Sequence, residues 1–206
     1  MSLNIAFSGA SHSGKTTKIE ELMVHYGSKL IVSDEIIRSK NINIKDVREN
    51  DNVYLDFEID VISQKIKTDF EYFEKYKNED VIVLTDRSIF DSINYWLLYL
   101  KPSALDNERL KKFHDFNHEL FTSVLEHYLN NLDFIFFFDK IETVDTKLEE
   151  DQYRELNLKY MQDAEYHLIK SLTFGSFPQH RVYPVNVKKD DLKFFIGLIE
   201  TWRSVK

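Results

Sequence analysis

The sequence predicts an α/β fold in which a five-stranded parallel sheet carries helices on both faces. Five short apolar segments, at residues 3–8, 29–33, 80–85, 133–139 and 181–185, alternate with longer segments of helical periodicity. These short segments are apolar almost throughout, which is typical of strands that are covered on both faces. With only 5 Gly and 3 Pro, the elements are expected to be long and the loops few.

The helical segments differ in how clearly they are marked. Residues 52–77 form the clearest helix, with a predicted core stripe of Leu55, Ile59, Ile62, Ile66, Phe70 and Phe73. Further helices are expected at residues 15–26, at 88–100 before Pro102, after Asp106 as an N-cap, and at 147–173. A closing helix should bury Leu192, Phe195, Ile196, Ile199 and Trp202.

The length, the amino-acid composition and the net charge of the chain exclude several classes of protein. A chain of 206 residues fits one domain spanning residues 1–206, and the absence of Cys excludes a disulfide scaffold and a cysteine nucleophile. No basic region precedes the first apolar run, and no segment reaches the roughly 18 apolar residues of a membrane span. We therefore expect a cytoplasmic protein without a membrane partner. The net charge of -8 disfavours a nucleic-acid partner but leaves a local basic groove open.

The segment Gly9–Thr16 (GASHSGKT) fits the phosphate-loop pattern GxxxxGK[ST] between a predicted strand and a predicted helix. The expected nucleotide-binding residues are Gly9, Ser11, His12, Ser13, Gly14, Lys15, Thr16 and Thr17. Lys15 would supply a point charge for the β- and γ-phosphates, and Thr16 a hydroxyl ligand for Mg²⁺. The isolated His12 has no metal-ligand spacing, so we expect it to be a loop residue. ATP and Mg²⁺ are the expected cofactors.

The rest of the chain argues against two other classes of nucleotide-binding protein. A GTPase should carry DxxG after its third strand, but Asp86-Arg87-Ser88-Ile89 lacks the glycine. An AAA-type machine needs a further helical domain for which the chain is too short. At the end of a central strand, Asp86 could hold the Mg²⁺ shell, and Arg87 could direct a bidentate fork at an oxyanion or phosphate of the acceptor.

The phosphate loop, Asp86-Arg87-Ser88 and the downstream Tyr95 together resemble the P-loop kinases of nucleosides and nucleotides, particularly thymidylate and deoxynucleoside kinases. The segment Asp34-Glu35-Ile36-Ile37-Arg38 resembles the E-x-x-R segment of small P-loop kinase-like domains of phage and bacteria. The resemblance implies a three-layer P-loop kinase fold with a helical lid at about residues 142–160, a role in nucleotide metabolism, and, for a viral protein, the host cytoplasm.

The acceptor side and the lid supply further candidates. Asp34, Glu35 and Arg38 follow the second strand, where a carboxylate could accept a proton from an attacking hydroxyl or bind a sugar. Each also has a simpler interpretation, as a helix cap or a helical ion pair. Arg154 is the expected lid cation, in a segment unusually rich in acids. The aromatic residues Tyr54, Phe57, Tyr95 and Trp96 are candidates for a base pocket.

The sequence leaves the acceptor open. Asp86-Arg87 favours a nucleoside monophosphate, whereas Ser88 and Glu35 favour a deoxynucleoside; on balance we expect Mg²⁺·ATP-dependent phosphoryl transfer to a monophosphate. The alternatives are a deoxynucleoside kinase, a kinase of polynucleotide ends or modified DNA bases, a kinase of another small metabolite, and a nucleotide-sensing module. A homodimer is compatible with the sequence.

Overall fold

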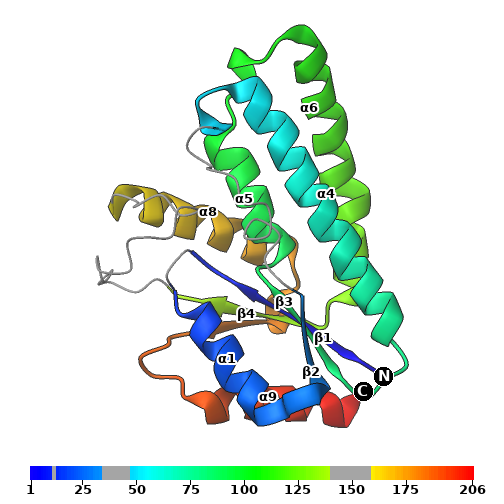
Figure 1. Ribbon diagram of the computed structural model, residues 1–206. Helices are drawn as coiled ribbons and strands as arrows, with labels where there is room; N and C mark the ends of the chain where they lie inside the picture. Colours follow the sequence, from blue (N-terminus) through cyan, green and yellow to red (C-terminus); the bar gives the residue numbers. More distant parts are fainter. Residues whose placement is uncertain (11–12, 34–46, 140–158) are drawn as a thin grey trace.

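The computed structural model describes residues 1–10, 13–33, 47–139 and 159–206. Within these ranges five strands form one sheet in the order β2-β3-β1-β4-β5, and every neighbouring pair is parallel (Figure 1). The strands are β1 (Leu3–Ser8), β2 (Leu30–Ser33), β3 (Ile82–Asp86), β4 (Phe134–Phe138) and β5 (Val182–Val185). The predicted five-stranded parallel sheet is therefore confirmed, with small shifts at the strand ends.

The described helices follow the predicted alternation with the strands. They are α1 (Lys15–Tyr26), α4 (Asp51–Tyr76), α5 (Ile89–Tyr99), α6 (Asn107–Glu119), α7 (Leu125–Asn131), α8 (Lys159–Ser176) and α9 (Leu192–Val205). Short 3₁₀ turns lie at Gly27–Lys29, Pro102–Ala104 and Gln179–Arg181. None of the described helices is both long and apolar enough to cross a bilayer.

The long helix predicted after Asp106 is present but locally widened. Asp106 caps it as expected, since its carboxylate accepts the Arg109 N–H at 2.9 Å. A π-helical stretch at Leu120–Val124 then separates α6 from α7. The helix predicted at residues 147–173 corresponds to α8, and its residues 147–158 lie outside the described part of the chain.

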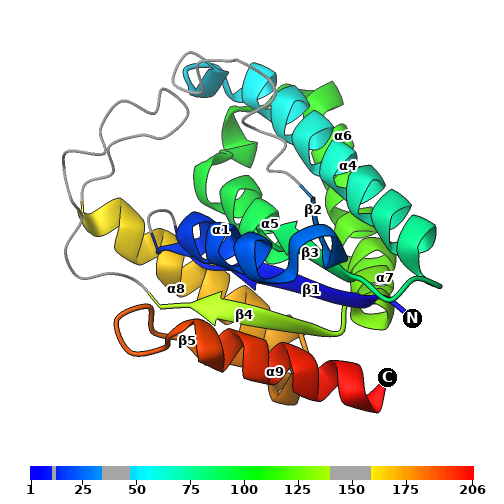
Figure 2. The same ribbon diagram turned by 60° about the horizontal axis from the view of Figure 1, so that its bottom comes forward.

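Helices cover both faces of the sheet, as the sequence predicts. On one face α1 and α9 pack on Phe7, Phe136 and Phe138 through residues such as Leu22 and Phe195. On the other face α4, α5, α7 and α8 cover the alternate strand residues (Figures 1 and 2). This three-layer arrangement leaves the carboxyl ends of the strands as the place where loops can gather side chains.

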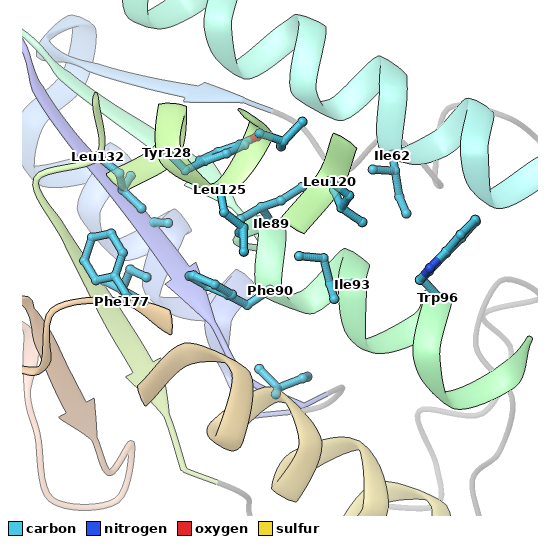
Figure 3. Close-up of a cluster of buried hydrophobic side chains, with 14 of the residues drawn as sticks. Ile62, Ile89, Phe90, Ile93, Trp96, Leu120, Leu125, Tyr128, Leu132 and Phe177 are labelled. Carbon is cyan, nitrogen blue, oxygen red and sulfur yellow. The ribbon is translucent and has the colours of Figure 1, made fainter. Parts of the chain in front are cut away.

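The core on the second face is built around α5 and combines aliphatic with aromatic side chains (Figure 3). Phe90 and Trp96 are fully buried there, and Trp96 stacks on Phe113 and donates a 3.2 Å hydrogen bond to Asn117. Trp96 is therefore a core residue. The prediction that it lines a base pocket was wrong.

The predicted core stripe of α4 is only partly correct. Leu55, Ile62 and Phe73 are buried, but Ile59, Ile66 and Phe70 are only half-buried. The buried face of α4 is rotated toward a different row that includes polar residues; its members are Tyr54, Leu55, Glu58, Val61, Ile62, Lys65, Asp69 and Phe73. Buried charges on one helix face require partners within the protein.

Candidate active site

The strand order brings the predicted site residues together. β1 lies between β3 and β4, with Phe7 paired to Asp86 across β1 and β3, and β2 lies on the other side of β3. The phosphate loop therefore starts beside the Asp86-Arg87 pair, because parallel neighbours end at the same edge of the sheet. The segment that follows Ser33, the last residue of β2, leaves from this edge as well.

Two glycines give the phosphate loop its shape. Gly9 and Gly14 have φ angles of 138° and 89°, which residues with a side chain rarely adopt. A Cβ atom on Gly9 would lie 2.6 Å from the carbonyl oxygen of Phe138, so the loop passes directly against β4. Gly14 precedes α1, whose first turn carries Lys15, Thr16 and Thr17 and no acidic residue. The positive end of the helix dipole therefore points into the loop.

Lys15 lies at the centre of the site. Its ammonium donates hydrogen bonds to the carbonyl oxygens of Gly9 (2.6 Å) and Ala10 (2.8 Å) and to Ser13 Oγ (3.1 Å). Burial, reinforced by the Arg87 guanidinium, lowers the pKa of Lys15 to about 8, against the opposing charges of Asp91, Asp86 and Glu165. The ammonium of Lys15 is therefore close enough to one other cation and three carboxylates to interact with all four charges.

The residues predicted to hold Mg²⁺ offer the right kind of donor atoms. Thr16 is exposed in the first turn of α1, and the half-buried Asp86 ends β3. Both supply oxygen ligands, which Mg²⁺ prefers, and Mg²⁺ commonly uses one or two protein ligands together with substrate phosphates. The described residues hold no group of three or more His, Cys, Asp or Glu side chains that could bind a metal without such phosphates.

Arg87 is held in an unusual conformation at the turn from β3 to α5. It is the sole non-glycine residue of the described ranges with a positive φ, 69°, and its side chain is almost completely buried. Its Nη1 donates to the Tyr95 hydroxyl at 3.2 Å and lies 3.9 Å from Asp91 Oδ1. The Tyr95 hydroxyl in turn donates to the buried carboxylate of Glu165 on α8. The guanidinium is therefore held by two side chains of α5, one of which, Tyr95, is itself bonded to α8.

Sequence reasoning missed Asp91, which is fully buried in the first turn of α5. Its carboxylate accepts hydrogen bonds from the side chains of Ser8 and Ser88 and from the backbone of Gly9 and Ser88. The spacing Ser88-x-x-Asp91 is that of a capping box, which was a readable signal for a helix start. The contacts to Ser8 and Gly9 had no local signal, because these residues, at the end of β1 and just after it, are 83 and 82 positions away in sequence.

A second buried cluster lies between α4 and α5. Tyr54 donates to the backbone oxygen of Tyr95 at 3.3 Å, and Glu58 one turn further along α4 is 3% exposed. The Arg48 guanidinium lies 3.7 Å from the ring centroid of Tyr99, which stacks on Tyr95. Burial raises the pKa of Glu58 to about 7, opposed by the Tyr54 hydrogen bond and the Arg48 charge. Tyr54, a predicted base-pocket candidate, is therefore a core residue that contacts the backbone of the second candidate, Tyr95.

Several predicted site residues lie outside the described part of the chain. These are Ser11, His12, Asp34, Glu35, Arg38 and Arg154, together with most of the predicted lid at residues 142–160. Seven other predicted site residues lie at or beside the carboxyl edge of β1 and β3. They are Gly9, Ser13, Gly14, Lys15, Asp86, Arg87 and Tyr95.

The all-parallel sheet with helices on both faces is a P-loop kinase-like α/β fold. In particular, the chain is similar to solved structures of deoxyadenosine kinase from M. mycoides. The structure with bound dATP matches with a TM-score of 0.63 and 15% identity, covering 98% of this chain and 100% of that one. The structure with the products dCMP and dCDP matches at 0.64 and 14%, covering 99% and 100%. At these identities the likeness shows the fold. No family model and no curated protein sequence matches the chain.

Proposed function

We propose that the protein transfers the γ-phosphoryl group of ATP to the 5′-oxygen of a deoxynucleoside. One observation carries this proposal: the phosphate-loop lysine and a buried arginine after β3 belong to one polar cluster at adjacent strand ends. A nucleotide sensor needs the first of these cations, whereas phosphoryl transfer also needs a group on the acceptor side. The whole-chain likeness to a deoxyadenosine kinase supports the same choice.

On the donor side, the backbone of Gly9, Ser13 and Gly14, with Thr17 at the start of α1, would surround the phosphates. Lys15 would release its bonds to the loop carbonyls and donate to the β- and γ-phosphates. Thr16 and Asp86 would hold Mg²⁺, which when bound neutralises charge on the phosphate oxygens.

On the acceptor side, Arg87 and Tyr95 would orient the acceptor, with Asp34 and Arg38 as further contacts from the segment after β2. Glu35 would accept the proton of the attacking hydroxyl as the new P–O bond forms and the bond to the bridging oxygen of ADP breaks. Arg154, in a lid at residues 142–160 of a single kinase domain, would meet the charge that spreads over the transferring group.

A second candidate acceptor is a nucleoside monophosphate. Arg87 favours it, because a guanidinium held by Tyr95 and Asp91 presents a fixed cation to an acceptor phosphate. This is the acceptor that the sequence alone favours on balance. We rank it second because the likeness to a deoxyadenosine kinase and the serine after Arg87 support a deoxynucleoside instead.

The experiment is an ADP-release assay with ATP alone, with each deoxynucleoside and with each monophosphate, followed by mass analysis of the product. We expect ADP release that depends on a deoxynucleoside and a product heavier by one phosphoryl group. Turnover with monophosphates alone would establish the second candidate. ATP binding without acceptor-dependent ADP release would contradict the proposal and favour a sensor.

A further inference from the structure

The carboxylate of Asp91 joins the two halves of the site. Its Oδ2 accepts hydrogen bonds from Ser8 Oγ (2.7 Å), Ser88 Oγ (2.7 Å) and Ser88 N (3.1 Å). Its Oδ1 accepts the Gly9 N–H at 3.1 Å and lies 3.9 Å from Arg87 Nη1. The Ser88 hydroxyl also lies 3.0 Å from Ser8 Oγ. These groups come from the end of β1 and from the turn between β3 and α5.

Capping α5 does not require all of these contacts. A capping box consists of reciprocal hydrogen bonds between the N-cap residue and the third helical residue, here Ser88 and Asp91. Asp106 caps α6 and Asp191 caps α9 without any bond to a distant strand among their described contacts. The bonds from Ser8 and Gly9 reach Asp91 across 83 and 82 residues of sequence. They tie α5 to the phosphate loop.

Both ends of this connection are stiff. Gly9 has no room to move toward β4, because a Cβ atom there would already overlap the Phe138 carbonyl. Arg87 has its backbone in the left-handed region and its guanidinium on Tyr95. Ser8, Ser88 and Asp91 are each at most 1% exposed, so water does not compete for their hydrogen bonds. A shift at one end is therefore transmitted to the other.

We infer that Asp91 is a positioning residue that fixes the start of the phosphate loop relative to Arg87, so that donor and acceptor groups keep one alignment. This inference rests on the proposed function. It assigns to Asp91 and its partner Ser8 an effect on transfer that goes beyond the stability of α5. Misplacement of reacting groups by about 1 Å can lower a rate by about 10²-fold.

The test compares Asp91→Asn and Ser8→Ala with Asp106→Asn, which makes the same Asp-to-Asn change at a helix cap remote from the site. Asp91→Asn replaces one carboxylate oxygen with an NH₂ group, so the side chain can no longer accept hydrogen bonds at both Oδ1 and Oδ2. Ser8→Ala removes the side-chain hydrogen bond from β1 to Asp91 and leaves the cap of α5 in place. The measurements are Tm, the Kd of a non-hydrolysable ATP analogue by calorimetry, and kcat and KM for both substrates.

We expect Asp91→Asn to lower kcat by about 10²-fold. Ser8→Ala should weaken binding of the ATP analogue and lower kcat, each by about tenfold or more, and both variants should keep a Tm above the assay temperature. Asp106→Asn should retain wild-type kinetics. Wild-type kcat, KM and Kd in folded Ser8→Ala would overturn the inference, even if Asp91→Asn fails to fold. If the wild-type protein transfers no phosphoryl group to any acceptor, the proposed function fails, while the calorimetric comparison still tests the link to the phosphate loop.

Discussion

The hydroxyl of Ser33, the last residue of β2, donates a 3.0 Å hydrogen bond to Asp69 on α4. The other oxygen of Asp69 lies 3.1 Å from Lys65 Nζ and accepts the hydroxyl of Tyr128 at 2.5 Å. All four side chains are buried, and burial together with Asp69 raises the pKa of Tyr128 well above its usual value. Tyr128 therefore stays a donor. The end of β2 is thus attached to the helical layer by polar contacts within an apolar core.

Asp69→Ala should be strongly destabilising. It leaves the Lys65 ammonium buried without this carboxylate and removes the acceptor of two hydroxyl groups, so we expect a loss of about 3–5 kcal/mol. The free energy of unfolding in urea measures this. The control is Asp56→Ala, which removes an exposed partner of Lys112 and Arg109 and should cost less than about 1 kcal/mol. Equal effects of the two substitutions would show that the Asp69 cluster does not stabilise the fold.

Lys15→Ala should abolish phosphoryl transfer and keep the fold. The ammonium contacts only loop atoms in its hydrogen bonds and belongs to neither apolar cluster. We expect a loss of at least about 10²-fold in turnover, as for removal of one preorganised electrostatic partner. Turnover and the circular-dichroism spectrum are measured beside Lys18→Ala, a lysine of the same helix paired with Glu21. Near-normal turnover in folded Lys15→Ala would refute the phosphate-loop assignment.

Arg87→Lys should damage acceptor binding more than ATP binding. An ammonium cannot bond Tyr95 and face Asp91 as the guanidinium fork does. We expect the KM of the acceptor to rise by about tenfold or more, with a smaller change in the KM of ATP. Steady-state kinetics with each substrate varied in turn provide the measurement. A larger effect on ATP than on the acceptor would place Arg87 on the donor side.

Glu35→Gln separates the two candidate acceptors. A 5′-hydroxyl needs a base to accept its proton, so with a deoxynucleoside turnover should fall by about 10²-fold or more. A monophosphate already presents an anionic oxygen, and the same change should then matter little. The comparison variant is Asp34→Asn, which leaves the proposed base intact. A small effect with a deoxynucleoside would exclude Glu35 as the base.

Glu58 should make the stability depend on pH. Its pKa in the folded protein is raised from 4.5 to about 7. The protonated Glu58 therefore adds to the free energy of unfolding below pH 4.5, and this addition is lost as the pH rises through 7. We expect the free energy of unfolding to fall by about 3 kcal/mol between pH 5 and pH 8 through this group. Urea unfolding at both pH values should show a smaller difference in Glu58→Gln and an unchanged one in the exposed variant Glu71→Gln. The same pH difference in all three proteins would contradict this assignment.

The fold was predictable because its signals are local. Apolar strands such as Phe134–Phe138 and the helix start at Asp106 are readable from short segments. The buried face of α4 could not be predicted in this way, because an analysis of hydrophobic periodicity assigns Glu58, Lys65 and Asp69 to the surface. Their burial depends on partners from β2, α7 and the segment before α4, and no pattern within the helix encodes those partners.

The site was predictable only where a motif is continuous. Lys15 and Arg87 stand in short runs that follow strands, so their chemistry could be inferred before their positions. Asp91 and Glu165 act through Ser8, Gly9 and Tyr95, and these contacts exist only after β1, β3 and α8 have assembled. The capping-box spacing of Ser88 and Asp91 signals a helix start and does not encode these contacts between distant segments.

The position of β1 in the sheet also governs when the chain can fold during synthesis. β1 leaves the ribosome first, yet its two neighbours are Ile82–Asp86 and Phe134–Phe138. Until the second of these has been made, one edge of β1 is unpaired, and Ile5 and Phe7 lack much of their apolar cover. Nascent chains of intermediate length are therefore expected to display an unpaired, aggregation-prone strand edge. The phosphate-loop segment precedes β4 in the chain, yet Gly9 can pack against Phe138 only after β4 has emerged.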